Sequence, residues 1–484
     1  MNSRYSPVSS AWTSFAAEEA DLGKKLVGLD IGTTTISALL LDVATGEVID
    51  VVTVKNGASL PGVADWDALQ NPTIILDLSR EILDTFLVRH GEIAGIGITG
   101  QMHGILYVDR HGQAVSPLMT WQDRRGDIAD DDGLTSTARL AAVTGRPVAA
   151  GMGNVTHLYN VRRGLVPPGT TSFCSVMDFV AMRLAGASRP LVDATNAAGF
   201  GAFELTTLRF MTEALESLGL DPALLPDVAI DYPAIGEMRN GCPVFVPLGD
   251  NQASFLGSVQ DIDGTVLANI GTGGQVSVFL PEFAEYADLD TRPFPYGGYL
   301  AVGASLCGGR AYAQLHRFLS EVLRLFTGKQ EVEADWEIMN AVDQANLVGA
   351  PLIADTRFTG TRADPTIRGA LTYIGLDNFT PEHLIAAVRS GLVSELADSY
   401  EHLPDTIRVA KRRLVGSGNG LRLNRALRSA FENRFGLTMH MPAHNEEAAF
   451  GAARLAGTAS KIFGNLGESS ALFRLTDSSV PSQT

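Results

Sequence analysis

The residues best suited to chemistry are a carboxylate and a row of small hydroxyls near the start of the chain. They lie in the stretch LDIGTTTISALLLD (29–42), which begins with Asp30. Because glycine and β-branched residues disfavour a helix, this stretch predicts a β-hairpin. Backbone N–H groups at such a tip can approach phosphate oxygens, and threonine hydroxyls add donors. A carboxylate beside a phosphate can hold Mg²⁺ through water, so Asp30 is a candidate metal residue. The tip supplies the candidate phosphate-binding residues Gly32, Thr33, Thr34 and Thr35.

A second stretch, ANIGTGGQVSVFLP (268–281), repeats this pattern. Ile270-Gly271-Thr272 falls on the Ile-Gly-Thr of the first copy, and Asn269 stands where the first copy has Asp30. Two such tips facing each other across a cleft would hold a polyphosphate from both sides. The alternative is that both stretches are ordinary edge hairpins. The second tip adds the candidate nucleotide-binding residues Gly271, Thr272 and Gly273.

A third glycine cluster follows a short apolar run in RLVGSGNGLRLN (413–424) and precedes a helical pattern at 425–436. Closely spaced glycines permit a flat ligand such as an adenine base to lie against the backbone. A flexible loop between a strand and a helix is the alternative. The candidate nucleotide-binding residues here are Gly416, Ser417, Gly418 and Asn419.

A candidate base lies in VPLGDNQASFLGS (246–258), where Asp250 follows a predicted strand and begins a predicted helix. Phosphoryl transfer asks little covalent chemistry of a protein, and a carboxylate of ordinary pKa can accept the hydroxyl proton late in the reaction. An aspartate at a helix start can also be a simple N-cap. The location of Asp250 near the junction of the two halves favours the catalytic interpretation.

The stretch GIGITG (95–100) matches a dinucleotide-binding fingerprint, on which an oxidoreductase hypothesis would rest. That fingerprint needs a helix directly after its glycines, whereas the next residues, QMHGILYVD, alternate like a strand. A Walker A motif is also absent from the sequence. Any nucleotide must therefore be bound by other loops.

The elements that position these residues divide the chain into two similar halves. A length of 484 residues predicts more than one domain, and the repeated hairpin indicates an internal duplication. Hairpins and helices in each half predict two α/β domains with a cleft between them. The expected divisions are a tail at 1–23, domains at 24–260 and 261–458, and a polar, loosely ordered tail at 459–484.

The composition limits the partners. A net charge of −17 argues against nucleic acid, which needs a basic surface. Three separated cysteines suit a reducing cytosol and predict neither a disulfide framework nor a metal cluster. No apolar run predicts a signal peptide or a membrane span, so a cytoplasmic protein is expected.

These motifs together resemble the FGGY family of carbohydrate kinases. The likeness runs from about residue 24 to 458 and rests on the Asp-x-Gly-Thr-Thr hairpin, the Gly-Asp-x-Gln element and the late glycine cluster. The resemblance implies an α/β fold of two duplicated actin-like (ribonuclease H-like) domains with a central catalytic cleft. It also implies ATP and Mg²⁺ as cofactors and a small ketose as substrate. Asp250 is implied as the catalytic base and as a second carboxylate near the metal, and the protein is expected to be a monomer or homodimer.

The same resemblance implies a sugar site. The segments GQMHG, TWQD, NAAGFGAF, PLGDNQAS and SLCGGR are most similar to family members that act on a seven-carbon ketose. A five-carbon ketose is the alternative substrate, and a sugar sensor without catalysis is the alternative function. The residues implied for sugar binding are Gln101, Met102, His103, Trp121, Asp123, Asn196, Asp250 and Asn251.

Overall fold

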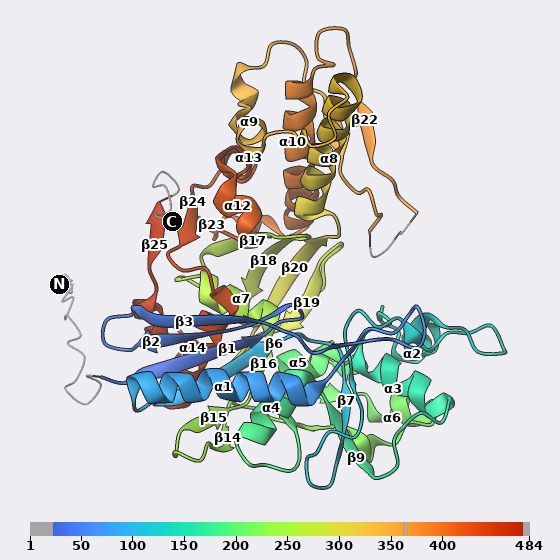
Figure 1. Cartoon of the computed structure of the whole chain (residues 1–484), viewed down its shortest axis with the longest axis vertical. Helices are drawn as coiled ribbons and strands as arrows, with labels where there is room; N and C mark the ends of the chain where they lie inside the picture. Colours follow the sequence, from blue (N-terminus) through green and yellow to red (C-terminus); the bar gives the residue numbers. More distant parts are fainter. Residues whose placement is uncertain (1–22, 362–363, 365, 478–484) are drawn as a thin grey trace, which may run out of the picture.

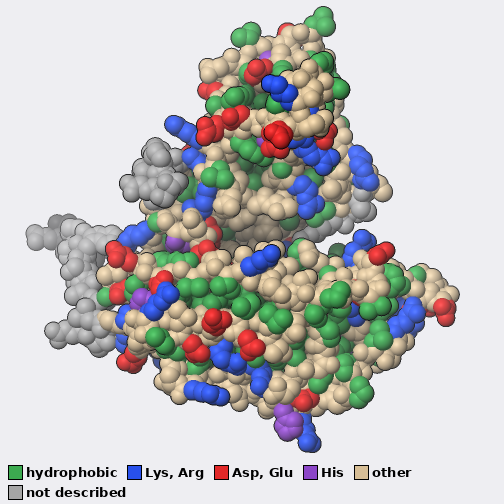
Figure 2. Space-filling model, viewed as in Figure 1, with side chains coloured by type: hydrophobic (Ala, Val, Ile, Leu, Met, Phe, Trp, Pro, Cys, Tyr) green, Lys and Arg blue, Asp and Glu red, His purple; other side chains and the backbone are tan. Residues whose placement is uncertain are grey.

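The chain forms two lobes, each built on a mixed β-sheet, in a computed structural model that describes residues 23–361, 364 and 366–477. Figure 1 shows the sheets one above the other, and Figure 2 shows a hollow between the lobes. The predicted N-terminal tail lies outside the described residues, apart from Gly23. Within the described part, no helix has the length and apolar character needed to cross a membrane.

The first sheet has the strand order β14-β15-β6-β1-β2-β3, with β16 also paired to β6. Strand β1 runs antiparallel to β2 and parallel to β6, which confirms the predicted first hairpin. Residues 95–100 form β6 and no helix follows them directly, so the dinucleotide fingerprint has the wrong context. The strands are β1 (Lys25–Ile31), β2 (Thr35–Asp42), β3 (Val48–Lys55), β6 (Gly95–Gly100), β14 (Ala234–Glu237), β15 (Pro243–Phe245) and β16 (Leu248–Gly249).

The second sheet has the order β19-β20-β18-β17-β23-β24-β25 and repeats the pairing of the first. Strand β17 is antiparallel to β18 and parallel to β23, as β1 is to β2 and β6. Asn269 occupies the same position in this register as Asp30 does in the first sheet, which confirms the predicted duplication. The strands are β17 (Thr265–Ile270), β18 (Gly274–Leu280), β19 (Asp290–Pro293), β20 (Tyr299–Ser305), β23 (Arg413–Ser417), β24 (Met439–Pro442) and β25 (Leu475–Asp477).

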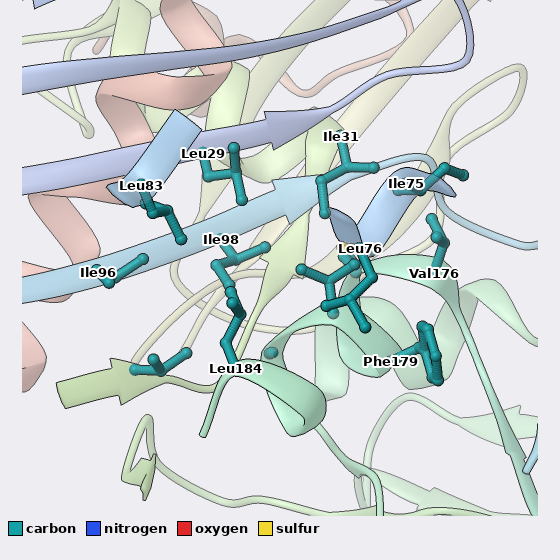
Figure 3. Packing of buried hydrophobic residues seen from close by; sticks show 14 of the residues in the cluster. Leu29, Ile31, Ile75, Leu76, Leu83, Ile96, Ile98, Val176, Phe179 and Leu184 are labelled. Carbon is teal, nitrogen blue, oxygen red and sulfur yellow. The ribbon is translucent and has the colours of Figure 1, made fainter. Parts of the chain in front are cut away.

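Helices α1 (Pro72–His90) and α4 (Val176–Leu184) cover one face of the first sheet. Figure 3 shows Leu76 of α1 and Phe179 of α4 packed with Ile98 of β6. The start of α1 is fixed by the Asn71 side chain, which accepts hydrogen bonds from the first-turn N–H groups, and by a proline at the first position.

Helices α8 (Gly308–Thr327), α10 (Pro381–Glu401), α12 (Asn419–Leu423) and α13 (Arg425–Phe435) belong to the second lobe. Helix α10 begins as predicted, because the Thr380 side chain accepts from the N–H of His383 and a proline follows. Leu392 and Leu396 of α10 and Phe431 of α13 pack against one face of the second sheet.

Helices α7 (Asp250–Ser258) and α14 (Glu447–Ala459) lie between the two sheets (Figure 1). Phe255 and Leu256 of α7 pack with residues of the second sheet, whereas Phe450 of α14 packs with the first sheet. The two helices touch through glycine: a Cβ on Gly257 would lie 1.7 Å from the Glu447 carbonyl oxygen. The contact between α7 and α14 therefore joins the two halves of the chain, and the helices are so close at Gly257 that no larger side chain fits there.

The first half also carries a side region with its own core, to the lower right in Figure 1. Tyr107, Phe173 and Phe200 are part of that core, which forms because the chain makes a long excursion between β6 and β14. Nothing in the sequence pattern predicted this separate core. Its larger elements are β7 (Leu106–Asp109), β9 (Thr170–Cys174), α2 (Ser136–Thr144), α3 (Gly153–Arg162), α5 (Ala194–Gly199) and α6 (Thr212–Ser217).

The prediction of a loosely ordered tail from 459 is wrong as far as residue 477. Strand β25 pairs with β24, and Leu472 and Phe473 are buried against α14. The segment is ordered because these two apolar side chains pack against α14. Its otherwise polar composition led to the wrong prediction. Residues 478–484 lie outside the described part. The remaining short elements are β4 (Ser59–Leu60), β5 (Leu69–Gln70), β8 (Leu118–Met119), β10 (Leu191–Val192), β11 (Phe203–Glu204), β12 (Arg209–Phe210), β13 (Asp227–Val228), β21 (Ile353–Asp355), β22 (Ala370–Thr372), α9 (Trp336–Ala341) and α11 (Asp405–Arg408).

Candidate active site

The tip of the first hairpin is held by side chains from outside the hairpin. The Asn56 Nδ2 donates to the Gly32 carbonyl at 2.8 Å, and the Gln70 Nε2 donates to the Thr33 carbonyl at 2.9 Å. Thr34 and Thr35 remain exposed. The tip is therefore fixed in place, while two of its hydroxyl-bearing residues stay open to a ligand.

Asp30 is the penultimate residue of β1, next to this tip, and is surrounded by protein with some surface still accessible. Burial raises the pKa of Asp30 from 3.8 to about 7, and the neighbouring charges of Asp250 and Glu446 add to the rise. The two carboxylates that the sequence singled out thus lie close enough to repel each other. Asp250 and Asp30 come from different strand ends, so the fold creates this juxtaposition.

Asp250 is the first residue of α7, and the N-cap position belongs to Gly249. The alternative that Asp250 is an N-cap is therefore wrong. Burial raises the pKa of Asp250, while the positive charge of Arg292 lowers it in part. The net direction is upward. Asn251, the next residue, donates from Nδ2 to the Gln275 Oε1 of β18 at 3.0 Å.

The carboxylates fit a hydrated divalent cation better than a cation held by protein ligands alone. Among the described residues, no group of three His, Cys, Asp or Glu side chains has an arrangement that could hold a metal ion. The mutual repulsion of Asp30, Asp250 and Glu446 would be relieved by a nearby positive charge. Mg²⁺ keeps several waters and binds through one or two carboxylates together with substrate phosphates.

Trp121 and Gln101, which are predicted to bind the sugar, contact the tip of the first hairpin at Thr33. The Trp121 Nε1 donates to the Thr33 Oγ1 at 3.0 Å, and this hydroxyl lies 3.5 Å from the Gln101 Oε1. Gln101 in turn donates from Nε2 to the Gln70 Oε1 at 2.9 Å. Trp121 is 47% exposed, which leaves part of its ring available to the C–H groups of a sugar. Thr33 therefore links the predicted phosphate and sugar sites.

His103 follows Gln101 and has a left-handed backbone conformation, with φ of 77°. Its Nδ1 lies 2.7 Å from the Gly199 carbonyl oxygen, a contact that fixes the ring against α5. The backbone conformation is uncommon for a residue with a side chain and is typical of ligand-binding turns.

Three residues implied for sugar binding are buried within the protein. Asp123 is fully buried and pairs with Arg125, with 2.8 Å between the Nε and the Oδ1. Asn196 is fully buried and donates from Nδ2 to the Asp178 Oδ2 at 2.5 Å. Met102 is 5% exposed. Both carboxylate oxygens of Asp123 accept hydrogen bonds from Arg125, whereas the Asn196 Oδ1 has no hydrogen-bond partner among the described residues. Contact of these two residues with a sugar stays a prediction.

The second hairpin tip is packed against the start of α8. The N–H of Gly309 donates to the Gly271 carbonyl at 3.1 Å, and the N–H of Arg310 donates to the Thr272 carbonyl at 3.0 Å. A Cβ on Gly308 would lie 2.0 Å from the carbonyl carbon of Gly273, so the glycine permits this approach. The N-terminus of a long helix carries partial positive charge, which favours phosphate at this tip.

The glycines of the third cluster are required by packing. A Cβ on Gly418 would lie 2.6 Å from the Ile270 carbonyl oxygen, and one on Gly416 would lie 2.7 Å from the Met439 Sδ. Ser417 is fully buried, and its Oγ accepts from the Asn269 Nδ2 at 2.8 Å. The Ser417 hydroxyl is therefore used within the protein, and contact of this residue with a nucleotide stays a prediction. Asn419 is exposed and remains a candidate.

Two charged residues near the site had no signal in the sequence. Arg292 reaches Asp250 from β19 of the second half, and its side chain is 18% exposed. Glu446 approaches Asp30 from the start of α14. Both come from segments without a recognisable motif, and only the fold brings them to the aspartates.

Comparisons with known proteins agree with this architecture. The N-terminal domain model of the FGGY family of carbohydrate kinases matches residues 25–257, and the C-terminal domain model matches residues 266–460. The sedoheptulokinase of Mus musculus is 28% identical, over 88% of this chain and 96% of its own length. The xylulose kinase of Staphylococcus xylosus is 24% identical, over 92% of this chain and 93% of its own.

Solved structures show the same fold. The xylulose kinase from Rhodospirillum rubrum has a TM-score of 0.80 at 22% identity, covering 94% of this chain and 93% of its own. The ligand-bound xylulose kinase from Lactobacillus acidophilus has a TM-score of 0.79 at 20% identity, with the same coverage. These matches confirm the two-domain, actin-like α/β fold class. With both family models matched across nearly the whole chain, the protein belongs to the FGGY family of carbohydrate kinases.

Proposed function

We propose that this sugar kinase transfers the terminal phosphoryl group of ATP to the terminal hydroxyl of a ketose, with sedoheptulose as its preferred substrate and sedoheptulose 7-phosphate as its product. The observation that supports the transfer is the approach of Asp30 and Asp250 at the junction of the lobes. Sugar and nucleotide residues meet there through Thr33. We place the reaction in the cytoplasm.

Asp250 accepts the proton of the attacking hydroxyl in this proposal. Its raised pKa suits that role, because a buried carboxylate accepts a proton more readily than an exposed one. The positive charge of Arg292 favours the ionised form of this carboxylate, which is the form that accepts a proton. Asp30 would hold Mg²⁺ through water, and the bound ion would neutralise charge on the phosphates.

The nucleotide phosphates lie between the two hairpin tips in this proposal. Gly32, Thr34 and Thr35 face them from the first half, and Gly271 and Thr272 from the second, next to the N-terminus of α8. Asn419 contacts the nucleoside. Gln101, His103 and Trp121 bind the sugar, with Asn251 beside the base.

The preference for seven carbons is supported by the sedoheptulokinases of Mus musculus and Homo sapiens, each 28% identical to this chain. Discrimination must come from the length of the pocket, since the reacting hydroxyl has to reach Asp250 in every substrate. A shorter sugar held at its carbonyl end would leave that hydroxyl short of the base, and a gap of about 1 Å can cost about 100-fold in rate. The xylulose kinase relative makes a five-carbon ketose the second candidate.

A panel of ketoses with Mg·ATP and an ADP readout tests this proposal. We expect kcat/KM for sedoheptulose to exceed that for xylulose by at least about tenfold, which is about 1.4 kcal/mol of transition-state binding. A larger kcat/KM for xylulose or ribulose would refute the sugar assignment and leave the kinase assignment intact. Failure of every ketose to stimulate ADP release would favour a sensor on the same fold.

A further inference from the structure

A partly open cavity with both polar and apolar lining lies in the upper lobe, away from the residues assigned to catalysis. Its volume is about 740 Å³, within the range of small-molecule sites. It is lined by one stripe of α10, one stripe of α13 and the segment 340–345. Helices α10 and α13 cover the face of the second sheet opposite α7, so Asp250 lies on the other side of that sheet. None of the candidate sugar, metal or nucleotide residues lines the cavity.

The cavity wall contains a buried arginine whose hydrogen bonds are incomplete. Arg389 is 2% exposed, and its Nη2 donates to the Val342 carbonyl at 2.8 Å. Its Nε and Nη1 have no hydrogen-bond partner among the described residues. A buried guanidinium without an anion is costly, because neither water nor a carboxylate replaces its lost hydration. The nearby Asp343 carboxylate therefore compensates this positive charge only in part, and two guanidinium nitrogens stay without an acceptor.

The other charges around the cavity add to this imbalance. Arg425 lies at the rim and makes no ion pair with any residue the structure describes. Arg434 forms ion pairs with both Asp398 and Glu401 of α10. The single carboxylate in the lining, Asp343, accepts from the N–H of Ala345 at 3.0 Å. An excess of arginine at one cavity is notable in a chain with a net charge of −17.

The remaining lining offers neutral hydrogen-bonding groups. Ser390 and Ser394 of α10 and Ser429 and Asn433 of α13 contribute hydroxyl and amide groups. Arginine beside hydroxyls and amides is the donor set that recognises phosphate, and arginine binds it through paired N–H groups. A cavity of this volume has room for more than a free phosphate ion.

From this donor set we infer that the groove between α10 and α13 is a second ligand site, which binds the phosphate group of a small metabolite through Arg389 and Arg425. The site is distinct from the cleft between the lobes. Its occupant is a phosphate monoester, with inorganic phosphate as the smaller alternative source of the same group.

Calorimetric titration of the full-length protein tests the inference, with the cleft occupied by Mg²⁺ and a non-hydrolysable ATP analogue. Ribose 5-phosphate is the probe, and inorganic phosphate and ribose are the comparisons. We expect saturable binding of ribose 5-phosphate and none of ribose. Tighter binding of the ester than of inorganic phosphate would identify a monoester as the occupant, and equal binding would identify the phosphate ion.

Two variants locate the binding. Ser429→Glu places a negative charge in the cavity at an exposed position, and Arg389→Met removes the buried charge. Each should weaken the binding of ribose 5-phosphate at least tenfold. Ser217→Glu makes the same charge change at an exposed position of α6 and should leave it unchanged. Absence of saturable binding to the wild type, or binding that Ser429→Glu does not weaken, would overturn the inference.

Discussion

Asp30 should reduce the stability of the free protein, and its replacement by asparagine should therefore increase it. The pKa of Asp30 is raised to about 7 from 3.8, mainly by burial and then by the charges of Asp250 and Glu446. Because the folded state binds the proton more tightly than the unfolded state, stability falls as the pH rises from about 4 to about 7. Asn has the same shape as Asp and carries no charge.

The magnitude follows from the two pKa values. A difference between about 7 and 3.8 corresponds to about 4 kcal/mol at 1.36 kcal/mol for each pKa unit, and this is the upper bound for the gain above pH 7. The gain should be small at pH 4, where the carboxyl is neutral in the folded state, should vanish only below about pH 3, where it is neutral in both states, and should reach a plateau at pH 8. In a chain of this size it corresponds to a rise in Tm on the order of 5 °C.

Thermal and urea unfolding of Asp30→Asn and wild type at pH 4, 6 and 8, with chelator present, measure this effect. Asp84→Asn is the matched control, because it removes the same charge from an exposed position on α1. Mg·ATP should stabilise the wild type by mass action and the variant much less. A variant no more stable than the wild type at pH 8, or a gain independent of pH, would refute the assignment of Asp30 as a strained carboxylate.

The other predictions concern the base, the helix junction and closure. Asp250→Asn should lower kcat at least about 100-fold in an ADP-release assay while ATP binding changes little, and turnover within tenfold of wild type would contradict its role as base. Arg454→Leu should destabilise the fold by about 2–4 kcal/mol, because the buried Arg454 Nη1 donates to the carbonyls of Leu256 and Val259. The KM for the ketose should not change. An unchanged Tm would show that these hydrogen bonds add little to stability. Sugar and an ATP analogue together should reduce the radius of gyration in small-angle scattering, whereas an unchanged radius would count against closure of the lobes.

The hairpins, the duplication and the helix starts could be predicted because their signals are local. Glycine and threonine at a tip, or threonine and proline before an apolar stripe, determine the backbone within a few residues. The exposure of Asp123 and Asn196 could not be predicted in this way. The burial of Asp123 and Asn196 depends on Arg125 and Asp178. The packing of α7 on the second sheet and of α14 on the first depends on contacts across the whole chain.

The glycine cluster shows a related limit. Its glycines favour the interpretation that a flat ligand lies on the backbone, yet Gly416 and Gly418 are each needed to let two parts of the protein approach. A glycine in sequence indicates a close approach without identifying what approaches. The candidate nucleotide contacts therefore rest on the first hairpin tip in one lobe and on Asn419, the second hairpin tip and the start of α8 in the other.

The difference between Asp30 and Asn269 follows from the different surroundings of two equivalent positions. In the second half the Asn269 amide donates to Ser417 on the neighbouring strand, which holds the hairpin to β23 without adding charge. In the first half Thr99 stands at the position of Ser417, but its hydroxyl donates to the Leu248 carbonyl at 2.8 Å and so binds β16, the strand that leads into Asp250. Because the Thr99 hydroxyl donates its proton to this carbonyl, it cannot donate the same hydrogen bond to the Asp30 carboxylate. Equivalent positions in the two sheets therefore have different roles. Asn269 forms a neutral hydrogen bond that links two strands, whereas Asp30 is a carboxylate that can bind a cation next to the proposed base Asp250.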